Sequence, residues 1–253
     1  MLGSLNNVEA LLDRLKASGV QFPEAKVGRD LNDGELKGVN CPECNNRGYI
    51  SYTKNGCLYS KPCKCMSMRG ALMLARKSGL DDIMKEYTFK SFSTPGDWER
   101  MAKEKAVDYV RNGSGKWFYI SGAPGSGKTH LCTAICSALL KSGTEVKYVL
   151  WRDIAQKLKT SINDPEYERL MDNLKRPQVL YIDDFLKGTV SDADINRAFE
   201  IINARYNATS KRTIISSERD LSDVRHYDEA VGSRIVQRSK GYCLKTTGKN
   251  WRN

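Results

Sequence analysis

The chain has 253 residues, of which 40% are hydrophobic and 28% are charged, the balance of a folded globular protein and not of a disordered or fibrous one. No apolar run approaches the roughly 20 residues that a membrane span requires, and the first residues lack the apolar core of a signal peptide, so we expect a cytoplasmic protein with no membrane partner. The excess of 41 Lys and Arg over 30 Asp and Glu gives a formal net charge of +11, which favours an anionic partner such as nucleic acid or nucleotide.

The N-terminal part of the chain holds most of its cysteines. Apolar residues recur at helical spacing between charges in residues 1–35, which predicts an amphipathic helix there. Five of the eight cysteines then fall between Cys41 and Cys65. Such a local cluster is typical of a metal site in a reducing compartment and not of a disulfide framework that spans the chain.

Four of these cysteines, Cys41, Cys44, Cys63 and Cys65, have the spacing C-x2-C-x18-C-x-C, close to that of zinc ribbons. Residues two apart in an extended segment point to the same face, so the second pair can direct both sulfurs at one ion. The Asn55-Gly step between the pairs predicts the turn of a β-hairpin, which the metal would hold in place. A closed shell of four thiolates leaves no open position, so we expect a structural and not a catalytic Zn²⁺.

Two alternatives to this zinc site remain open. Cys57 can replace Cys63 as the third ligand, but it lies beside the predicted turn and is the weaker choice. Free buried thiols or a redox pair would also account for the cluster.

The segment that follows is expected to join two domains. Residues 66–79 predict a short basic helix, and turn signals then precede a helix predicted over residues 98–111. We place the boundary near residue 90, so that a metal-binding domain of residues 1–90 precedes a larger domain of residues 91–253.

Short β-type runs alternate with helical ones in the larger domain. The predicted strands span residues 117–120, 145–150, 179–182, 213–216 and 242–245. This alternation predicts an α/β fold, a parallel sheet with helices on both faces.

A phosphate-binding loop follows the first of these strands. Its sequence, Gly122-Ala-Pro-Gly-Ser-Gly-Lys-Thr, matches G-x-x-x-x-G-K-[ST] and lies between a strand and a helix, as this motif requires. The backbone N–H groups would surround phosphates at a helix N-terminus, Lys128 would neutralise phosphate charge and Thr129 would offer its hydroxyl to Mg²⁺. A dinucleotide fold is excluded because no G-x-G-x-x-G occurs. The residues expected to bind ATP or ADP are Gly122, Ala123, Pro124, Gly125, Ser126, Gly127, Lys128, Thr129 and His130.

Two carboxylates end a later strand. Asp183 and Asp184 follow a buried apolar run, where a charge is costly unless a metal ion or a bound water awaits it. Asp183 would hold the Mg²⁺ shell together with Thr129, and Asp184 would orient or deprotonate the attacking water. Many ATPases of this class carry Glu at the second position, so the shorter Asp184 predicts slow turnover. An acidic pair that only marks the end of a strand is the alternative.

Two arginines, Arg234 and Arg238, lie four residues apart on a predicted helix near the C-terminus. Taken alone, a solvated basic face accounts for them as well as a functional role does.

In combination, the motifs resemble the DnaC/DnaI-type helicase loaders, above all their phage and mobile-element branch, with the IstB transposition helpers as related proteins. The likeness covers nearly the whole chain from about residue 40. It rests on C-P-x-C…C-x-C, the basic helix ending in Lys-Ser-Gly-Leu, Gly-Ser-Gly-Lys-Thr-His-Leu, Leu-Tyr-Ile-Asp-Asp-Phe and Gly-Ser-Arg-Ile. The resemblance implies a P-loop NTPase fold of the AAA+ type whose ATP lies between subunits. Arg234 would be the finger that reaches a neighbour's γ-phosphate, and Arg238 is a weaker candidate for a sensor in the same subunit.

The resemblance also implies partners. The helix pair predicted within residues 151–176 would line single-stranded DNA, and the metal-binding domain would bind a hexameric, DnaB-like replicative helicase. Assembly into a homo-oligomer would depend on ATP.

One position departs from the family's pattern. Loaders often end the fourth strand of the sheet in Thr-Ser-Asn, where the Asn senses the γ-phosphate, whereas Glu218 stands at that place here. A carboxylate would repel the phosphate, so either Ser216 or Ser217 senses it or Glu218 points away.

We therefore expect an ATP-dependent DNA replication factor that loads a replicative helicase onto single-stranded DNA, with ATP binding and slow, Mg²⁺-dependent hydrolysis as its switch. The alternative is an IstB-like ATPase that assists DNA transposition. The catalytic residues would be Lys128, Asp184 and Arg234, and the cofactors ATP or ADP, Mg²⁺ and Zn²⁺.

Overall fold

The structure is a computed structural model that describes residues 41–66, 69, 78–80 and 83–246. The helix expected within residues 1–35 and most of the basic helix expected over residues 66–79 lie outside the described residues. The chain divides into two compact units, Met1–Cys65 and Met66–Asn253, and each is described here by itself.

The division between the units falls after Cys65 and not near residue 90, where the sequence led us to expect it. Leu80 is fully buried and Phe92 nearly so, and both side chains belong to a hydrophobic core of the larger unit. Ile83 and Phe89 pack against the same core. The segment before residue 91 therefore belongs to the larger unit, because it supplies apolar side chains to that core. The turn signals that follow this segment in the sequence did not indicate this packing.

The smaller unit contains a two-stranded antiparallel hairpin, as the Asn-Gly step predicts. Strand β1 (Tyr49–Lys54) pairs along its whole length with β2 (Cys57–Pro62). Asn55 and Gly56 form the turn, with positive φ angles of 51° and 75°. Two consecutive positive φ angles give the turn a twist that matches the twist of the strands, which explains the preference for Asn-Gly at this place.

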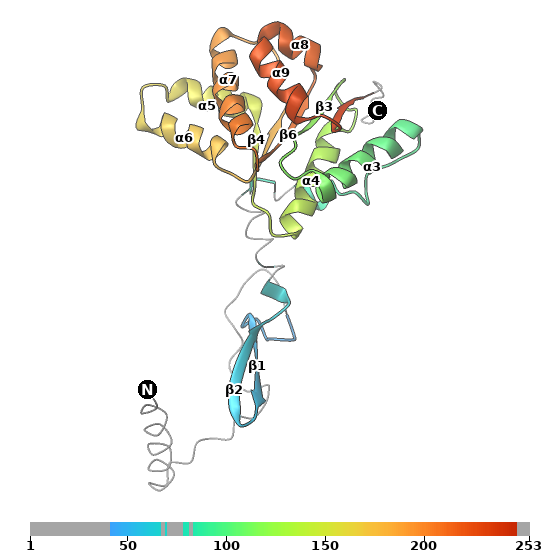
Figure 1. Ribbon diagram of the computed structural model, residues 1–253, viewed down its shortest axis with the longest axis vertical. Coiled ribbons are helices and arrows are strands. Elements are labelled where there is room, and N and C mark those ends of the chain that lie inside the picture. The colour runs from blue at the N-terminus through green and yellow to red at the C-terminus, as the bar shows by residue number, and fades with distance from the viewer. Residues whose placement is uncertain (1–40, 67–68, 70–77, 81–82, 247–253) are drawn as a thin grey trace. The chain divides into compact units, whose positions relative to one another are not determined.

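The larger unit is built on a five-stranded sheet in which every strand pair is parallel (Figure 1). The spatial order of the strands is β4-β5-β6-β3-β7, so β3 lies inside the sheet although it comes first in the chain. The parallel sheet that the alternating pattern predicts is thereby confirmed. The strands are β3 (Phe118–Ser121), β4 (Val146–Leu150), β5 (Val179–Asp183), β6 (Arg212–Ser217) and β7 (Cys243–Lys245).

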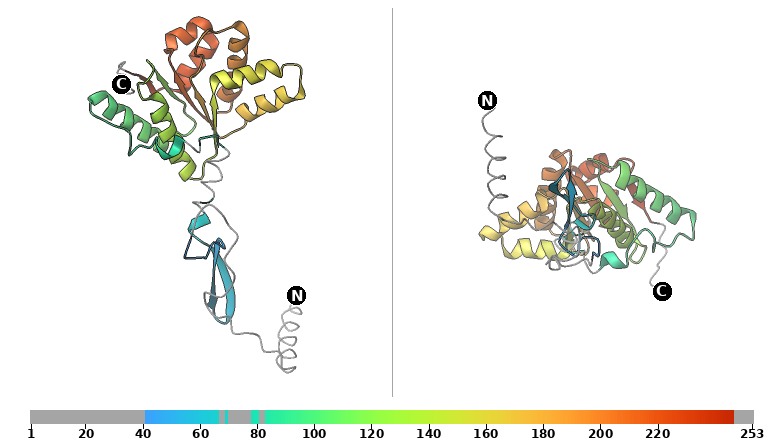
Figure 2. Two further views of the ribbon diagram at one scale, coloured as in Figure 1. Left: turned by 180° about the vertical axis from the view of Figure 1, so that it is seen from behind. Right: turned by 90° about the horizontal axis from the view of Figure 1, so that it is seen from below.

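Helices cover both faces of this sheet (Figures 1 and 2). Phe118 and Ile120 of β3 pack in one hydrophobic core with α3 and α4, while Tyr119 between them packs in a second core with α5 to α9. Successive residues of a strand point to opposite faces, so one short strand supplies both cores. The helices are η1 (Ile83–Lys85, a 3₁₀ turn), α3 (Asp97–Asn112), α4 (Lys128–Lys141), α5 (Trp151–Thr160), α6 (Pro165–Lys175), α7 (Asp192–Asn207), α8 (Leu221–Tyr227) and α9 (Glu229–Arg238).

The carboxyl ends of the strands meet at one edge of the sheet. Strands β5, β6 and β3 are neighbours, so the loops that follow them leave the sheet side by side. In open parallel sheets, ligands bind in the crevice outside these ends, where neighbouring connections run to opposite faces. This edge therefore brings together the phosphate-binding loop, the two carboxylates at the end of β5 and the residues at the end of β6.

Candidate functional site

The phosphate-binding loop connects β3 to α4, and its glycines are required by its shape. Gly122 has a φ of 134°, and a Cβ atom there would collide with the side chain of Thr246. Gly127 adopts the left-handed conformation, with a φ of 85°, immediately before α4 begins at Lys128. Side chains rarely tolerate these angles, so the loop can turn this tightly only with glycine.

The loop offers positive charge and backbone donors at the start of α4. The first N–H groups of a helix have no partner within it and attract anions. The Lys128 ammonium donates to the carbonyl oxygens of Gly122 and Ala123, both at 2.8 Å. Burial lowers the pKa of Lys128, while the carboxylates of Glu218 and Asp184 favour its charged form. A buried ammonium held only by carbonyls has unused capacity for a stronger, anionic acceptor such as phosphate.

The two residues expected to hold Mg²⁺ lie together. The Thr129 hydroxyl donates to Asp183 Oδ1 at 3.2 Å, although the two residues come from different elements. The Ser216 hydroxyl also donates to Asp183 Oδ1, and the Tyr148 hydroxyl donates to Asp183 Oδ2 at 3.4 Å. A buried carboxylate beside a hydroxyl is the hard oxygen donor set that Mg²⁺ accepts while it keeps several waters. The side chains present therefore fit a Mg²⁺–nucleotide complex.

Asp184 is held in an unusual backbone conformation beside this pair. Its φ is 53°, in the left-handed region that Asp tolerates better than most residues. Its N–H donates to the Ser216 hydroxyl at 3.1 Å, and its Oδ2 lies 3.0 Å from the Lys187 ammonium. The Asp184 carboxylate lines a pocket at this edge of the sheet together with the phosphate-binding loop.

The nucleotide pocket encloses about 250 Å³ at this edge of the sheet. Seven of the nine residues expected to bind ATP line it, and the other two, Gly122 and Ala123, hold Lys128 through their carbonyls. The lining consists of Tyr87, Pro124, Gly125, Ser126, Gly127, Lys128, Thr129, His130, Asp184, Lys187 and Glu218.

Tyr87 and Lys187 line the pocket without having been expected there. The Tyr87 ring stacks on His130 with 4.8 Å between centroids, and His130 Nε2 lies 3.0 Å from the Thr88 carbonyl oxygen. Tyr87 carries no motif, and its segment was assigned to the other domain. Lys187 stands three residues after Asp184 and contacts it locally, but only the pairing of β5 with β6 reveals its contact with Glu218.

Glu218 faces the nucleotide pocket and does not point away from it. Its Oε1 lies 2.7 Å from the Lys187 ammonium. The neighbouring hydroxyls have other partners, because Ser216 donates to Asp183 and Ser217 donates to the Phe185 carbonyl at 2.7 Å. The charge of the Glu218 carboxylate is thus compensated by a lysine.

The two arginines of α9 lie outside the lining of this pocket, among the residues that the structure describes. The Arg234 guanidinium lies over the rings of Phe199 and Tyr206, 5.2 and 5.6 Å from their centroids, and donates to the Ala230 carbonyl. Arg238 donates to the Thr209 carbonyl at 2.9 Å. Arg238 therefore ties α9 to the loop after α7, whereas Arg234 packs on two partly exposed rings.

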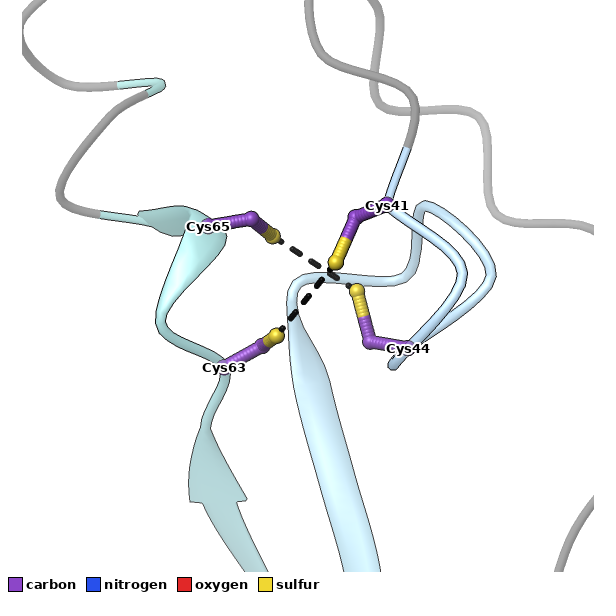
Figure 3. A group of neighbouring side chains, drawn as sticks. All are labelled: Cys41, Cys44, Cys63 and Cys65. Atoms are coloured by element: carbon purple, nitrogen blue, oxygen red, sulfur yellow. Dashed lines mark hydrogen bonds between the residues drawn. The ribbon is translucent and has the colours of Figure 1, made fainter.

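The four expected metal ligands converge in the smaller unit (Figure 3). The sulfurs of Cys41, Cys44, Cys63 and Cys65 all lie within 4.8 Å of one another, and all four residues are buried. Two pairs lie 3.7 and 3.6 Å apart, Cys41 with Cys63 and Cys44 with Cys65. Sulfurs at the corners of a tetrahedron lie about 3.8 Å apart when Zn–S bonds are about 2.3 Å. The cluster therefore fits a tetrahedral ion, and its separations are too long for a disulfide.

Cys57 lies elsewhere in the hairpin. It is exposed at the first position of β2, opposite Lys54, and is not among the four clustered sulfurs. The N–H of Gly48 donates to the Cys44 sulfur at 3.3 Å, a contact of the kind that orients metal-bound thiolates.

A second polar pocket of about 190 Å³ lies beside α5. Arg152, Gln156 and Lys159 are exposed on one face of that helix and line the pocket together with Lys187. This face is the most basic part of the lining, and it belongs to the helix pair expected to meet DNA.

Among the described residues, no helix is long and apolar enough to cross a lipid bilayer.

Comparisons with known sequences agree with this site. Residues 64–249 match the family model described as IstB-like ATP binding protein. The chain is 30% identical over 204 residues to the uncharacterized protein YqaM of Bacillus subtilis, a match that covers 75% of this chain and 64% of YqaM. It is 27% identical over 255 residues to the phage-like element PBSX protein XkdC of the same bacterium, a match that covers 95% of this chain and 93% of XkdC. It is 25% identical over 191 residues to the replicative helicase loader DnaC of Escherichia coli, covering 69% and 76%.

Solved structures have the same fold. The crystal structure of the DnaC helicase loader is similar with a TM-score of 0.56 and 21% identity, covering 66% of this chain and 99% of that chain. The crystal structure of DnaI gives a TM-score of 0.53 and 25% identity, covering 66% and 92%. The structure of the replication initiator DnaA bound to AMPPCP and single-stranded DNA gives a TM-score of 0.54 and 26% identity. This match covers 63% of this chain and 49% of that chain.

Proposed function

Because this chain belongs to the family of IstB-like ATP-binding proteins, we propose that it is an ATP-dependent DNA replication factor that loads a replicative helicase onto single-stranded DNA. Its larger unit is an AAA+ P-loop domain like those of DnaC and DnaA. The observation that carries the proposal is the convergence of Lys128, the Thr129–Asp183 pair and Asp184 on one pocket. This arrangement supports binding and hydrolysis of a nucleoside triphosphate.

The extent of the matches favours loading over transposition. The DnaC match covers 69% of this chain, and that relative is named a replicative helicase loader. A putative insertion sequence ATP-binding protein of Sinorhizobium fredii matches only 35% of the chain, at 35% identity. Among the sequence relatives, the wider match is to a named helicase loader and supports loading. The family model over residues 64–249, described as IstB-like ATP binding protein, makes a transposition helper the second candidate.

Each polar side chain of the site has a part in the proposed hydrolysis. Bound Mg²⁺ would spread the phosphate charge, with Thr129 and Asp183 holding its shell. Lys128 exchanges its carbonyl acceptors for phosphate oxygens, and Asp184 accepts a hydrogen bond from the attacking water. Arg234 would complete the site of a neighbouring subunit after it leaves the rings of Phe199 and Tyr206. Slow turnover is expected because Asp184 is one methylene shorter than Glu.

The cysteine cluster is proposed to hold a structural Zn²⁺. Among the twelve strand residues of the hairpin, Ile50 alone is partly buried and the rest are exposed. A hairpin without a hydrophobic core is at most marginally stable, so the metal would supply the free energy that orders it.

One face of this hairpin is proposed to bind the helicase. Tyr52 and Tyr59 stand opposite each other on the two strands, 40% and 46% exposed, with ring centroids 5.7 Å apart. Exposed aromatic side chains held in a rigid pair are typical of the energetic centre of a protein interface. The likeness to the replicative helicase loader DnaC supports a replicative helicase as this partner.

The basic face of α5 is proposed to contact single-stranded DNA. Arg152 and Lys159 lie one above the other on it and project from the same domain as the ATP site. Side chains of this kind bind phosphates without regard to base sequence.

Capture of the intact protein from its own cells tests the proposed function. With a non-hydrolysable ATP analogue and Mg²⁺ present, mass spectrometry should identify a replicative helicase among the bound proteins. The variant Tyr52→Ala/Tyr59→Ala should lose it, whereas Ser51→Ala/Thr53→Ala on the opposite face of the hairpin should retain it. Recovery of a transposase in place of a helicase would support the second candidate.

A further inference from the structure

Lys187 holds the two carboxylates that would otherwise face the terminal phosphate. Its ammonium lies 3.0 Å from Asp184 Oδ2 and 2.7 Å from Glu218 Oε1, and all three residues line the nucleotide pocket. Asp184 follows β5 and Glu218 follows β6, so the lysine bridges the ends of two neighbouring strands. The hydrogen bond to Glu218 is the largest influence that raises the pKa of Lys187, which keeps the side chain charged.

The charges of the pocket require this lysine if a triphosphate binds. Lys128 and Lys187 are the cationic side chains in its lining, and Asp184 and Glu218 are the anionic ones, so among the described residues the lining is neutral. Asp183 directly beneath it adds a further negative charge. Without Lys187 the lining would hold two carboxylates and only the Lys128 ammonium, so the γ-phosphate would meet a net negative charge in a partly desolvated site, where like charges repel strongly.

Lys187 is also free enough to change partners. One third of its side chain is exposed, and both carboxylates are about one quarter exposed. Leu186 and Gly188 on either side of it have positive φ angles of 54° and 89°, so the backbone turns sharply there and leaves the ammonium at the pocket wall. A partly exposed ion pair costs little to exchange for another anion.

On the premise that this pocket binds ATP, which is part of the proposed function, we propose that Lys187 binds the γ-phosphate and neutralises Glu218. In the structure Lys187 bridges Asp184 and Glu218. When ATP is bound, the ammonium turns to a γ-phosphate oxygen and stays within reach of Glu218, which frees Asp184 to bind the attacking water. ADP has no γ-phosphate, so Lys187 remains with Asp184 and the site is inactive.

Calorimetric titration of the full chain with Mg²⁺ and either a non-hydrolysable ATP analogue or ADP tests this proposal. Lys187→Gln should weaken binding of the ATP analogue about tenfold or more, because it removes a contact and exposes Glu218. Binding of ADP should change by no more than about threefold, because its phosphates lie farther from the substitution. Lys187→Arg should keep most of the preference for the ATP analogue.

Glu218 supplies the second arm of the experiment. Glu218→Gln should bind the ATP analogue as tightly as the unsubstituted chain or more tightly, and Lys187→Gln/Glu218→Gln should recover part of the affinity that Lys187→Gln loses. Lys175→Gln is the matched control, because Lys175 forms a comparable pair with Glu200, at 2.5 Å, outside the lining of the pocket. It should leave both affinities unchanged and lower thermal stability by about as much as Lys187→Gln does.

Three results would overturn the proposal. The first is equal weakening of the ATP analogue and ADP by Lys187→Gln, which would make the bridge a structural support. The second is unchanged affinity for the ATP analogue in that variant. The third is a Glu218→Gln chain that loses as much affinity as Lys187→Gln. Failure of the unsubstituted chain to bind either nucleotide would instead reject the proposed function itself.

Discussion

Arg205 is a fully buried charge that holds the end of the inserted helix pair to the sheet. From α7 its guanidinium donates to the Thr213 hydroxyl at 2.9 Å and to the carbonyls of Leu174 and Pro177 at 3.2 and 3.1 Å. Burial lowers its pKa to about 10, so the side chain stays charged at neutral pH. Its donors satisfy carbonyl groups in the last turn of α6 and just after it, which no sequence motif would indicate.

Replacement of this arginine should therefore destabilise the fold. We expect Arg205→Met to lower the free energy of unfolding by about 2–4 kcal/mol, because several buried carbonyls lose their donor together. Urea denaturation of the full chain measures the change. Arg176→Met removes an exposed pair with Asp172 and should cost less than about 0.5 kcal/mol. Equal costs for the two variants would contradict the role given to Arg205.

Lys128 supplies a prediction about binding and not about stability. Its ammonium is held by two loop carbonyls and needs phosphate only when nucleotide is present. Lys128→Ala should abolish ATP binding in calorimetry while the chain stays folded by circular dichroism. Lys141→Ala, an exposed lysine at the other end of α4, should bind ATP normally. Normal affinity in Lys128→Ala would contradict the assignment of the phosphate loop.

Arg234 supplies a prediction about hydrolysis. Arg234→Ala should bind ATP almost normally, because Lys128, Thr129 and Asp183 of the same subunit make the ground-state contacts. Hydrolysis should fall, by a factor on the order of 10³ where an arginine finger is fully developed and by less in a slow enzyme. Steady-state hydrolysis with single-stranded DNA present measures the loss.

Mixed assemblies distinguish an arginine that acts on a neighbour from one that acts on its own subunit. Arg234→Ala chains combined with Lys128→Ala chains should recover activity, since some interfaces then pair an intact phosphate loop with an intact finger. Mixtures that assemble together without any recovery would place the action of Arg234 within its own subunit.

At the scale of elements, the hairpin and the phosphate loop differ in what keeps them in shape. The loop is enclosed by β3, α4 and the side chain of Phe92, which lies against Gly127. The hairpin buries Ile50 and four cysteines and little else. Its order should therefore depend on the metal, whereas the loop should keep its shape without nucleotide.

Removal of the metal tests this difference. We expect a single Zn²⁺ per chain, lost in Cys41→Ser, Cys63→Ser and Cys65→Ser and retained in Cys57→Ser, because the exposed Cys57 lies outside the cluster. Elemental analysis measures the content. A chelator should expose the hairpin to proteolysis and leave ATP binding intact. Zinc loss from Cys57→Ser as large as from Cys63→Ser would show that the third ligand is misassigned.

At the scale of the whole molecule, the charge of +11 makes DNA binding sensitive to salt. The logarithm of the affinity for single-stranded DNA should fall linearly with the logarithm of the salt concentration. The slope should be about 0.7 for each phosphate contacted. Arg152→Ala/Lys159→Ala should reduce that slope by about 1.4, measured by fluorescence anisotropy. Lys157→Ala carries its change on another side of α5, where the side chain does not line the second pocket, and should leave the slope unchanged. If Lys157→Ala reduced the salt slope by the same amount, single-stranded DNA would not bind preferentially to the face of Arg152 and Lys159.

The sequence by itself determined what depends on neighbours along the chain. Strands β3 to β7 begin and end within about two residues of the predicted ranges, because each is a short apolar run between turn residues or helices. The phosphate loop and its place between strand and helix follow from one motif. The hairpin turn and the four clustered cysteines follow from local spacing in the same way.

Only the tertiary structure decided which side chains from separate elements meet. The strand order places β6 between β5 and β3, and this order brings Glu218 to Lys187 and Ser216 to Asp183. The same packing moved the boundary between the units to Cys65, because Leu80 is buried in the core of the larger one. Periodicity and motifs describe the surroundings of a residue over a few positions along the chain. These side-chain contacts join residues more than 30 positions apart. The local pattern does not specify the path of the connections between them.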